Sequence, residues 1–369
     1  MIRWFNPANL LLISWSNPMT PLTADMPADL IAQADLFHWP APQDARADWR
    51  KEWYHFCVLG ESIHVIVNLS LCGDTRPAAP SGAQLARVLV MTRSVARDVA
   101  WDGDVETLPW RDVRIASDVI DVRFGHNTVR FQDGLFDLSV ALQDRPIALK
   151  LCLRPLALPL VMRNNARIGE GSLNWLVAPR LAAGGTITVG RSVHLLKDAP
   201  AYHDHNWGRW LWGQDFAWQW GFGLQADALW SAVFYRTTNR ARSRVRDLSL
   251  ALWKGERLRR VFAGREVQVH QSGYLSRSRV DKYPRVMALV SPEITTDVPR
   301  HLDVIAAAGG DHVRCHFLAE DVAQVVIPNE SDLDSTLVNE AVGRVTLEGR
   351  VEGEAISMEG RGGFEFLNA

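Results

Sequence analysis

Apolar and polar residues alternate over many short segments of the chain, which is the pattern of strands with one buried face. In residues 63–71 every second residue is apolar, and polar residues such as Asn68 and Ser70 stand between them. Residues 147–153 repeat the pattern. Further candidate strands lie at 87–92, 113–124, 128–132, 135–142, 186–189, 217–225, 229–235, 248–253, 259–262, 286–290, 302–306, 313–317, 322–327, 344–351 and 355–360.

Glycine-containing pairs separate many of these segments, and few stretches read as helical. Turns are predicted at Asp102-Gly103, Asp133-Gly134 and Gly184-Gly185. Helices are predicted at residues 28–37, with Pro27 in the first turn, and at 332–342. Many short strands at close spacing are typical of sandwiches and barrels. We therefore predict an all-β fold of two consecutive β-barrels or strongly curved antiparallel sheets, with few short helices.

The length of 369 residues exceeds one domain of average size and suits two. We expect an N-terminal lead-in over residues 1–45, a first β-barrel domain over 46–195 and a second over 196–369. Residues 181–200 are interpreted as the passage between the two halves. The halves show no strict repeat by residue identity, but two β units of similar size are predicted.

Charge and cysteine content narrow the class of protein. The formal net charge is −2, and no basic stripe interleaves with aromatic residues, which argues against a nucleic-acid partner. The sequence contains no run of 18 apolar residues, so no transmembrane helix is predicted. The cysteines are scattered, without the spacing of a metal site, and are expected to be reduced. They are Cys57, Cys72, Cys152 and Cys315.

The start of the chain faintly imitates a signal peptide. Residues 1–15 hold a short apolar run, but no small-x-small cleavage site follows, and Pro18 stands directly after. Met19 is a second candidate start. We expect a cytoplasmic protein that contacts a membrane transiently to collect its ligand.

Tryptophan is unusually frequent, with 15 in the chain. Six of them fall within 24 residues: Trp207, Trp210, Trp212, Trp218, Trp220 and Trp230. Tryptophan is large and apolar and carries one hydrogen-bond donor. Two interpretations stand equally: a β core that uses tryptophan, or a cavity for a long hydrophobic ligand or a cation.

The densest cluster of polar and aromatic residues is Tyr202-His203-Asp204-His205-Asn206-Trp207-Gly208. In an extended strand successive side chains point to opposite faces. Tyr202, Asp204 and Asn206 would then share one face, and His203 and His205 the other. One face therefore offers an acid, a phenol and an amide, and the opposite face an imidazole pair.

The imidazole pair allows two roles. A His-x-His pair can bind Zn²⁺ if a third ligand is present, and His194 or Asp215 would have to supply it. Neither HExxH nor paired CxxC occurs. We favour the other role, in which His203 and His205 bind buried carboxylates and carbonyls, and predict no metal. GxSxG and phosphate-loop motifs are also absent, so no cofactor is predicted.

The carboxyl of Asp204 allows acid–base chemistry. Burial beside Tyr202 and tryptophans would raise its pKa, so that it stays protonated near neutral pH and can act as a general acid. Protonation of a carbon–carbon double bond gives a carbocation, which aromatic faces stabilise by about 2 kcal/mol each when dry. The alternative is a structural network in which Asp204 pairs with His205 or Arg209.

The motif at residues 202–208 resembles the central motif of a lipocalin-like superfamily with two consecutive β-barrels. This superfamily includes carotenoid 1,2-hydratases, hydroxyneurosporene synthases, and Diels–Alderases and cyclases of natural-product pathways. The resemblance covers about residues 48–367. Weaker matches are Glu52-Trp53-Tyr54, Trp101-Asp102-Gly103-Asp104 and Gly360-Arg361-Gly362-Gly363-Phe364-Glu365.

The resemblance implies a cofactor-free enzyme in which Asp204, Tyr202 and Trp175 are catalytic. Asp204 would protonate the terminal double bond of an acyclic carotenoid or another isoprenoid, Trp175 and Tyr202 would shield the cation, and water would add. A cyclase on a hydrophobic polyene and a non-catalytic carrier remain the alternatives. The residues predicted to bind the hydrophobic substrate are His203, His205, Asn206, Trp207, Trp210, Trp218, Trp220 and Asn174.

Overall fold

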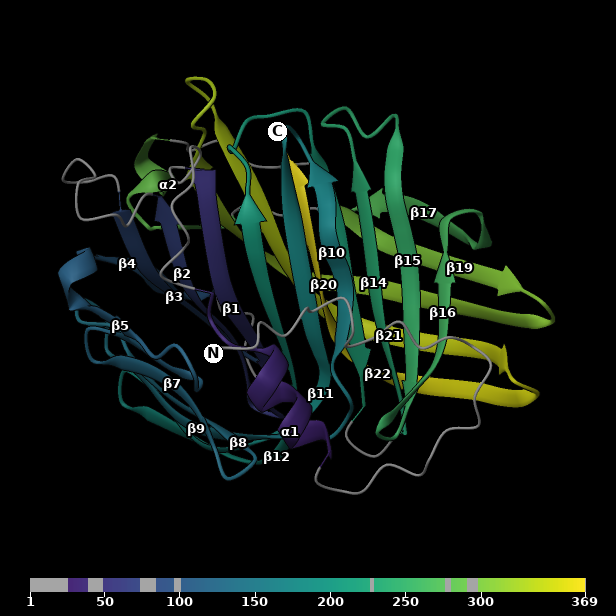
Figure 1. Ribbon diagram of the computed structural model, residues 1–369, viewed down its shortest axis with the longest axis horizontal. Helices are drawn as coiled ribbons and strands as arrows, with labels where there is room; N and C mark the ends of the chain where they lie inside the picture. Colours follow the sequence, from purple (N-terminus) through teal and green to yellow (C-terminus); the bar gives the residue numbers. More distant parts are fainter. Residues whose placement is uncertain are drawn as a thin grey trace, which may run out of the picture.

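The computed structural model describes residues 26–38, 49–73, 84–95, 101–225, 229–275, 280–290 and 298–368. It confirms the predicted all-β class, because two large and mainly antiparallel sheets follow each other along the chain. The first sheet curls from the purple and blue strands to the teal strands β11 (Gly171–Val189) and β12 (Ser192–Arg209) in Figure 1, and the second occupies the green and yellow part. Within the described ranges, no helix has the length and apolar character needed to cross a membrane.

The first sheet has 12 strands, in the order β4-β3-β2-β1-β12-β11-β9-β8-β7-β6-β5, with β10 paired to β11. A one-turn 3₁₀ helix, η3 (Trp110–Asp112), precedes β5, and the far end of the sheet at β6 comes back to contact β3. The sheet is therefore nearly closed into a barrel. Its strands are β1 (Arg50–Leu59), β2 (Ile63–Gly73), β3 (Gln84–Ser94), β4 (Asp102–Leu108), β5 (Val113–Ile115), β6 (Asp121–Phe124), β7 (Asn127–Gln132), β8 (Leu135–Ala141), β9 (Ile147–Pro155), β10 (Leu160–Ile168), β11 (Gly171–Val189) and β12 (Ser192–Arg209).

The second sheet has 10 strands, in the order β16-β15-β14-β13-β22-β21-β20-β19-β17, and the short β18 pairs in parallel with β20. A second 3₁₀ turn, η4 (Gly264–Glu266), precedes β17. The strands are β13 (Ala217–Leu224), β14 (Trp230–Thr238), β15 (Val245–Lys254), β16 (Arg257–Ala263), β17 (Val267–Tyr274), β18 (Asp281–Tyr283), β19 (Pro299–Ala308), β20 (Asp311–Pro328), β21 (Ser335–Val351) and β22 (Glu354–Asn368).

Buried apolar residues form three layers. One cluster fills the interior of the first sheet, one lies between the two sheets, and one lies inside the second sheet. Central strands are therefore covered on both faces, and nearly every residue of β1 and β13 is buried. Peripheral strands such as β8 keep the alternation of buried and exposed residues that a single covered face produces.

The two predicted helices have different outcomes. The helix predicted at 28–37 is present as α1 (Met26–Ala34), and Ile31 and Phe37 pack into the interior of the first sheet. The helix predicted at 332–342 is wrong, since these residues run into strand β21. Buried polar residues hid the alternation there, because Asn339 and Glu340 face other polar groups within the sheet.

Two further segments depart from their sequence prediction. The strand predicted at 286–290 is instead the short helix α2 (Met287–Val290). The turn predicted at Gly184-Gly185 is a bulge inside β11, where Gly185 has φ +129 and an added Cβ would lie 2.1 Å from the Lys150 carbonyl oxygen. The supposed passage 181–200 is therefore the body of the β11–β12 hairpin, and the predicted turn at Asp102-Gly103 likewise lies within β4.

The division of the chain into domains at residues 195 and 196 stays a prediction. That position falls within β12, which pairs with β1 and β11 of the first sheet as far as Arg209.

The hairpin turn predicted at Asp133-Gly134 is confirmed, with φ +52 and +77 at these residues. The candidate start at Met19 lies outside the described residues.

Candidate functional site

The central motif lies on β12, and its side chains alternate between two environments as predicted. Tyr202 belongs to the layer between the sheets, where its ring stacks on Phe222 of β13 at 4.3 Å between ring centroids. His203 stacks on Phe56 at 4.1 Å, inside the first sheet. The acid face of the motif therefore points at the second sheet, and the imidazole face points into the first barrel.

Asp204 is buried in the layer between the sheets, with a relative exposure of 1%. The Tyr202 hydroxyl donates to its Oδ2 at 2.9 Å, and the Asn206 amide donates to its Oδ1 at 2.6 Å. Burial and the negative charge of Glu365 raise the pKa of Asp204 to about 8, although hydrogen bonds from Tyr202 and Trp175 act in the opposite direction. Asp204 is therefore protonated near neutral pH.

A small pocket opens beside Asp204. Its volume is about 20 Å³, which is room for roughly one water molecule. Side chains of both sheets enclose it: Trp53, His55, Leu173, Trp175, Asp204, Asn206, Trp218, Trp220, Tyr235 and Glu365. We call it the inner pocket.

A larger cavity adjoins the inner pocket, and the two share Trp53, Trp218 and Glu365 in their walls. Its volume is about 260 Å³, compared with the roughly 150 Å³ of an apolar cavity that holds benzene. We call it the outer cavity. Its walls come from β1 to β4, from β20 to β22 and from Pro284 and Met287 at α2, and they are mainly apolar. Its polar lining consists of Lys51, Asn68, Ser70, Cys72, Arg87, Thr107, Glu340 and Glu365.

Two buried glutamates stand in the second sheet opposite Asp204. Glu340 of β21 and Glu365 of β22 are direct cross-strand partners and share a hydrogen bond. The Trp218 indole N–H donates to Glu365 Oε1, and Trp220 is a second donor to this carboxyl. Burial raises the pKa of both carboxyls, and the charge of Glu365 raises that of Glu340 further.

The imidazole face of the motif binds carboxylates that sequence analysis did not find. Asp35, just after α1, accepts from His203 Nε2 at 2.8 Å and from His205 Nδ1 at 2.9 Å. His205 Nε2 lies 3.0 Å from Glu52 Oε1. Burial lowers the pKa of His205, but its bonds to Asp35 and Glu52 outweigh burial and raise it to about 9. For Glu52, burial raises the pKa, but the hydrogen bonds and charges of His205 and His38 outweigh burial and lower it to about 2.

This network also contains the one group among the described residues with the spacing of metal ligands. Ligand atoms of His38, Glu52 and His205 lie within 4.8 Å of one another. The third ligands considered from the sequence lie elsewhere, since His194 bonds to Ser62 and the carboxylate of Asp215 bonds to the backbone N–H of residue 240 and to residue 246. None of these three residues lines the inner pocket or the outer cavity.

The structure brings together some of the predicted site residues and separates others. Those that line the inner pocket are Asp204, Trp175, Asn206, Trp218 and Trp220, and Tyr202 bonds directly to Asp204. Those that line neither pocket nor cavity are His203, His205, Trp207, Trp210 and Asn174.

The three residues of the second set that are not histidines have clear surroundings. Trp207 stacks on His38 at 4.3 Å, and the Trp210 ring packs edge-on against Trp53 at 5.5 Å between ring centroids. Asn174 bonds to the backbone of Asn165 and Trp207. All three side chains therefore brace the sheet around the motif.

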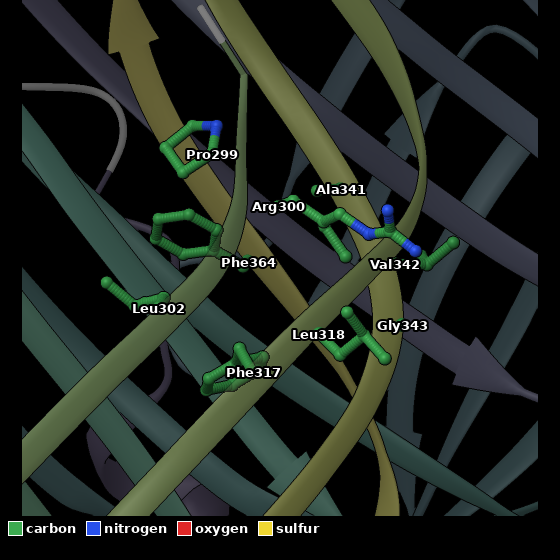
Figure 2. A pocket seen from close by; sticks show the side chains of 10 residues that line it. Pro299, Arg300, Leu302, Phe317, Leu318, Ala341, Val342, Gly343 and Phe364 are labelled. Atoms are coloured by element: carbon green, nitrogen blue, oxygen red, sulfur yellow. The ribbon is translucent and has the colours of Figure 1, made fainter. Parts of the chain in front are cut away.

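A further hollow lies in the second sheet, between residues of β19 to β22 (Figure 2). Pro299, Phe317 and Phe364 are among its walls. Its volume is about 10 Å³, which is less than a water molecule comfortably fills. The cavity beside Asp204 is therefore the better candidate for a ligand.

Solved structures share this fold over most of their length. A candidate AttH protein from Nitrosomonas europaea is 14% identical with a TM-score of 0.62, and the alignment covers 94% of this chain and 98% of that protein. Kievitone hydratase from Nectria haematococca is 11% identical with a TM-score of 0.57, over 89% and 94% of the two chains. CghA with Sch210972 is 14% identical with a TM-score of 0.58, over 87% and 89%.

Sequence comparison adds no relative. No protein-family model matches the chain, and no curated protein matches its sequence. The structural likeness confirms the fold expected from the motif at residues 202–208. Identities this low establish the fold alone, so the reaction must be argued from the site.

Proposed function

We propose that this chain is a cofactor-independent enzyme that protonates a carbon–carbon double bond of a hydrophobic substrate, with hydration as the outcome. The observation that carries the proposal is a buried Asp204, with a pKa that burial raises to about 8, in a small pocket that adjoins an apolar cavity. A carboxylic acid kept neutral by its surroundings can deliver its proton to an alkene. A carboxylate in the same place has no proton to deliver.

Three contacts prepare Asp204 for this step. Asn206 donates to Oδ1 and holds this side of the carboxyl in place. The Tyr202 hydroxyl lies 2.9 Å from Oδ2 and can stabilise the carboxylate that forms when the proton leaves. Tyr202 is itself held by stacking on Trp220 and Phe222, so the acid has a fixed orientation.

The double bond would meet Asp204 where the outer cavity adjoins the inner pocket, and aromatic faces line the inner pocket there. Trp175 lies 4.9 Å from Tyr235 and 6.2 Å from Trp220 between ring centroids, and all three line the inner pocket. Each face can stabilise a dry cation by about 2 kcal/mol. This arrangement favours carbocation chemistry over simple storage of a ligand.

The size of the inner pocket favours water as the nucleophile. It has room for about one water molecule beside Asp204, whereas the outer cavity can hold one end of an isoprenoid or a smaller polyene. The structural neighbour kievitone hydratase is named for a hydration, which agrees with this outcome. We propose an acyclic carotenoid or related isoprenoid as the substrate class.

Cyclisation is the second candidate. The same cation could be captured by another double bond of the substrate, because the outer cavity holds the chain in an apolar enclosure close to Asp204. The structural neighbour CghA, solved with Sch210972, is a Diels–Alderase, which agrees with this second outcome. Hydration adds the mass of water to the substrate, whereas cyclisation leaves the mass unchanged.

The proposal can be tested by expressing the chain in a host that makes acyclic carotenoids and analysing the apolar extract by mass spectrometry. We expect a product heavier by one water, which disappears in Asp204→Asn. The matched control is Asp198→Asn, because Asp198 is an exposed carboxylate on the same strand, with 70% side-chain exposure. An extract unchanged by the wild-type chain would remove carotenoid hydration, and a new product of unchanged mass would support cyclisation.

A further inference from the structure

We propose that Glu365 is the catalytic base of this site, which accepts a proton from the water that attacks the cation. The inference rests on the proposed function and assigns the second proton transfer of the reaction. It concerns a residue that the reaction described so far does not use.

The position of Glu365 is the first argument. It lies on β22 between its cross-strand partners Trp220 on β13 and Glu340 on β21. Its side chain lines both the inner pocket and the outer cavity, whereas Glu340 lines the outer cavity alone. Of the three buried carboxyls Asp204, Glu340 and Glu365, the first and the last therefore share the small pocket that has room for water. They approach it from opposite sheets.

The hydrogen bonds of Glu365 are the second argument. Trp218 Nε1 donates to Oε1, and Trp220 is a further donor to the same carboxyl. Donors favour the ionised form of a carboxyl. Glu340 lacks indole donors and shares a hydrogen bond with Glu365, so the proton of this pair resides on Glu340 and the negative charge on Glu365.

The negative charge of Glu365 helps the reaction in two ways. It helps to keep Asp204 protonated before the reaction, because the pKa of Asp204 is raised by Glu365. Once the proton has moved to the substrate, the same charge stabilises the positive centre across the pocket. The carboxylate is then in place to accept a proton from water.

Asp204 and Glu365 together account for both proton transfers of the reaction. The O–H bond of Asp204 breaks, a C–H bond forms, and Asp204 is left as a carboxylate beside a carbocation. The oxygen of water bonds to the cationic carbon while one of its protons moves to Glu365. Transfer of that proton from Glu365 to Asp204 restores both groups, and the net change is the addition of water to a double bond.

The charge assignment can be tested without a substrate by infrared spectroscopy of the full chain near neutral pH. We expect Glu365→Gln to remove a carboxylate band, and Glu340→Gln to remove the band of a protonated carboxyl. The Glu365→Gln side chain still accepts from Trp218, so the variant is expected to fold. Loss of a protonated carboxyl band in Glu365→Gln would overturn the proposal, because a neutral Glu365 cannot act as the base.

The catalytic role is tested by the pH profile of kcat/KM with the acyclic carotenoid that the wild-type chain hydrates. We expect Glu365→Gln to lower kcat/KM by about 100-fold or more and to lose the acidic limb, while the alkaline limb set by Asp204 moves to lower pH because the charge of Glu365 no longer raises its pKa. Glu359→Gln is the matched control, since Glu359 is exposed on the same strand. Wild-type activity with an unchanged Glu365→Gln profile would overturn the base, and a wild-type chain that hydrates no carotenoid would overturn the proposed function and the base with it.

Discussion

Replacing Asp204 by asparagine should make the protein more stable near neutral pH while it removes activity. Asparagine matches the protonated acid in size and charge: its carbonyl can accept from Asn206, and the Tyr202 hydroxyl, which donates to Asp204, can turn to accept from its amide. Asparagine does not ionise, so its folding carries no cost for keeping a carboxyl protonated at a pH where the unfolded chain would release the proton. The stability gained measures how strongly the fold holds Asp204 in its neutral form.

The magnitude follows from the pKa of Asp204, which the fold raises from 3.8 to about 8. Above pH 3.8 the unfolded chain releases this proton while the folded chain keeps it, so stability falls as pH rises until about pH 8 and is constant beyond. The loss is about 1.4 kcal/mol per pH unit, or on the order of 4 kcal/mol at pH 7. The asparagine variant lacks this loss.

Urea unfolding followed by tryptophan fluorescence would measure the effect at several pH values between about 5 and 7. We expect the free energy of unfolding of Asp204→Asn minus that of wild type to rise by about 3 kcal/mol over this range. The same difference for Asp198→Asn should stay flat, because that side chain is 70% exposed. Parallel profiles for wild type and Asp204→Asn would refute the reasoning, since Asp204 would then already be ionised when folded.

Three further changes test other parts of the structure. Tyr202→Phe removes a hydrogen bond that lowers the pKa of Asp204, so the alkaline limb of the activity profile should move to higher pH. Asp35→Ala leaves the protonated His205 with one carboxylate partner fewer in a buried site, and calorimetry should show a loss of roughly 3–5 kcal/mol in stability. Leu89→Trp places a larger side chain in the wall of the outer cavity, so binding of a fluorescent polyene should weaken at least tenfold while the melting temperature changes little.

Local sequence patterns predicted much of the fold. The alternation of residues 63–71 and 147–153 predicted β2 and β9, and the extended motif placed Asp204 and His205 on opposite faces of one strand. These features depend on neighbours in sequence, which a single chain displays directly. The first half of β21 was taken for a helix because its buried Glu340 broke the apolar pattern, whereas the strand predicted at 344–351 is its second half.

Partners from distant strands could not be read in the same way. Asp35 lies 168 residues from His203, and Glu365 meets Trp218 across 147 residues. Which strands pair, and in what register, is decided by tertiary packing rather than by any local pattern. The sequence motif therefore pointed to Asp204, and the sheet order was needed to find the carboxyls around it.

The central claim is that Asp204 places a proton on carbon, which turnover in heavy water tests most directly. Purified protein would be incubated with an acyclic carotenoid in D₂O, and the product would be returned to ordinary water before mass spectrometry. We expect one deuterium retained on carbon with the wild-type chain and none with Asp204→Asn. A product without carbon-bound deuterium, or equal incorporation by the variant, would contradict the assignment of Asp204 as the acid.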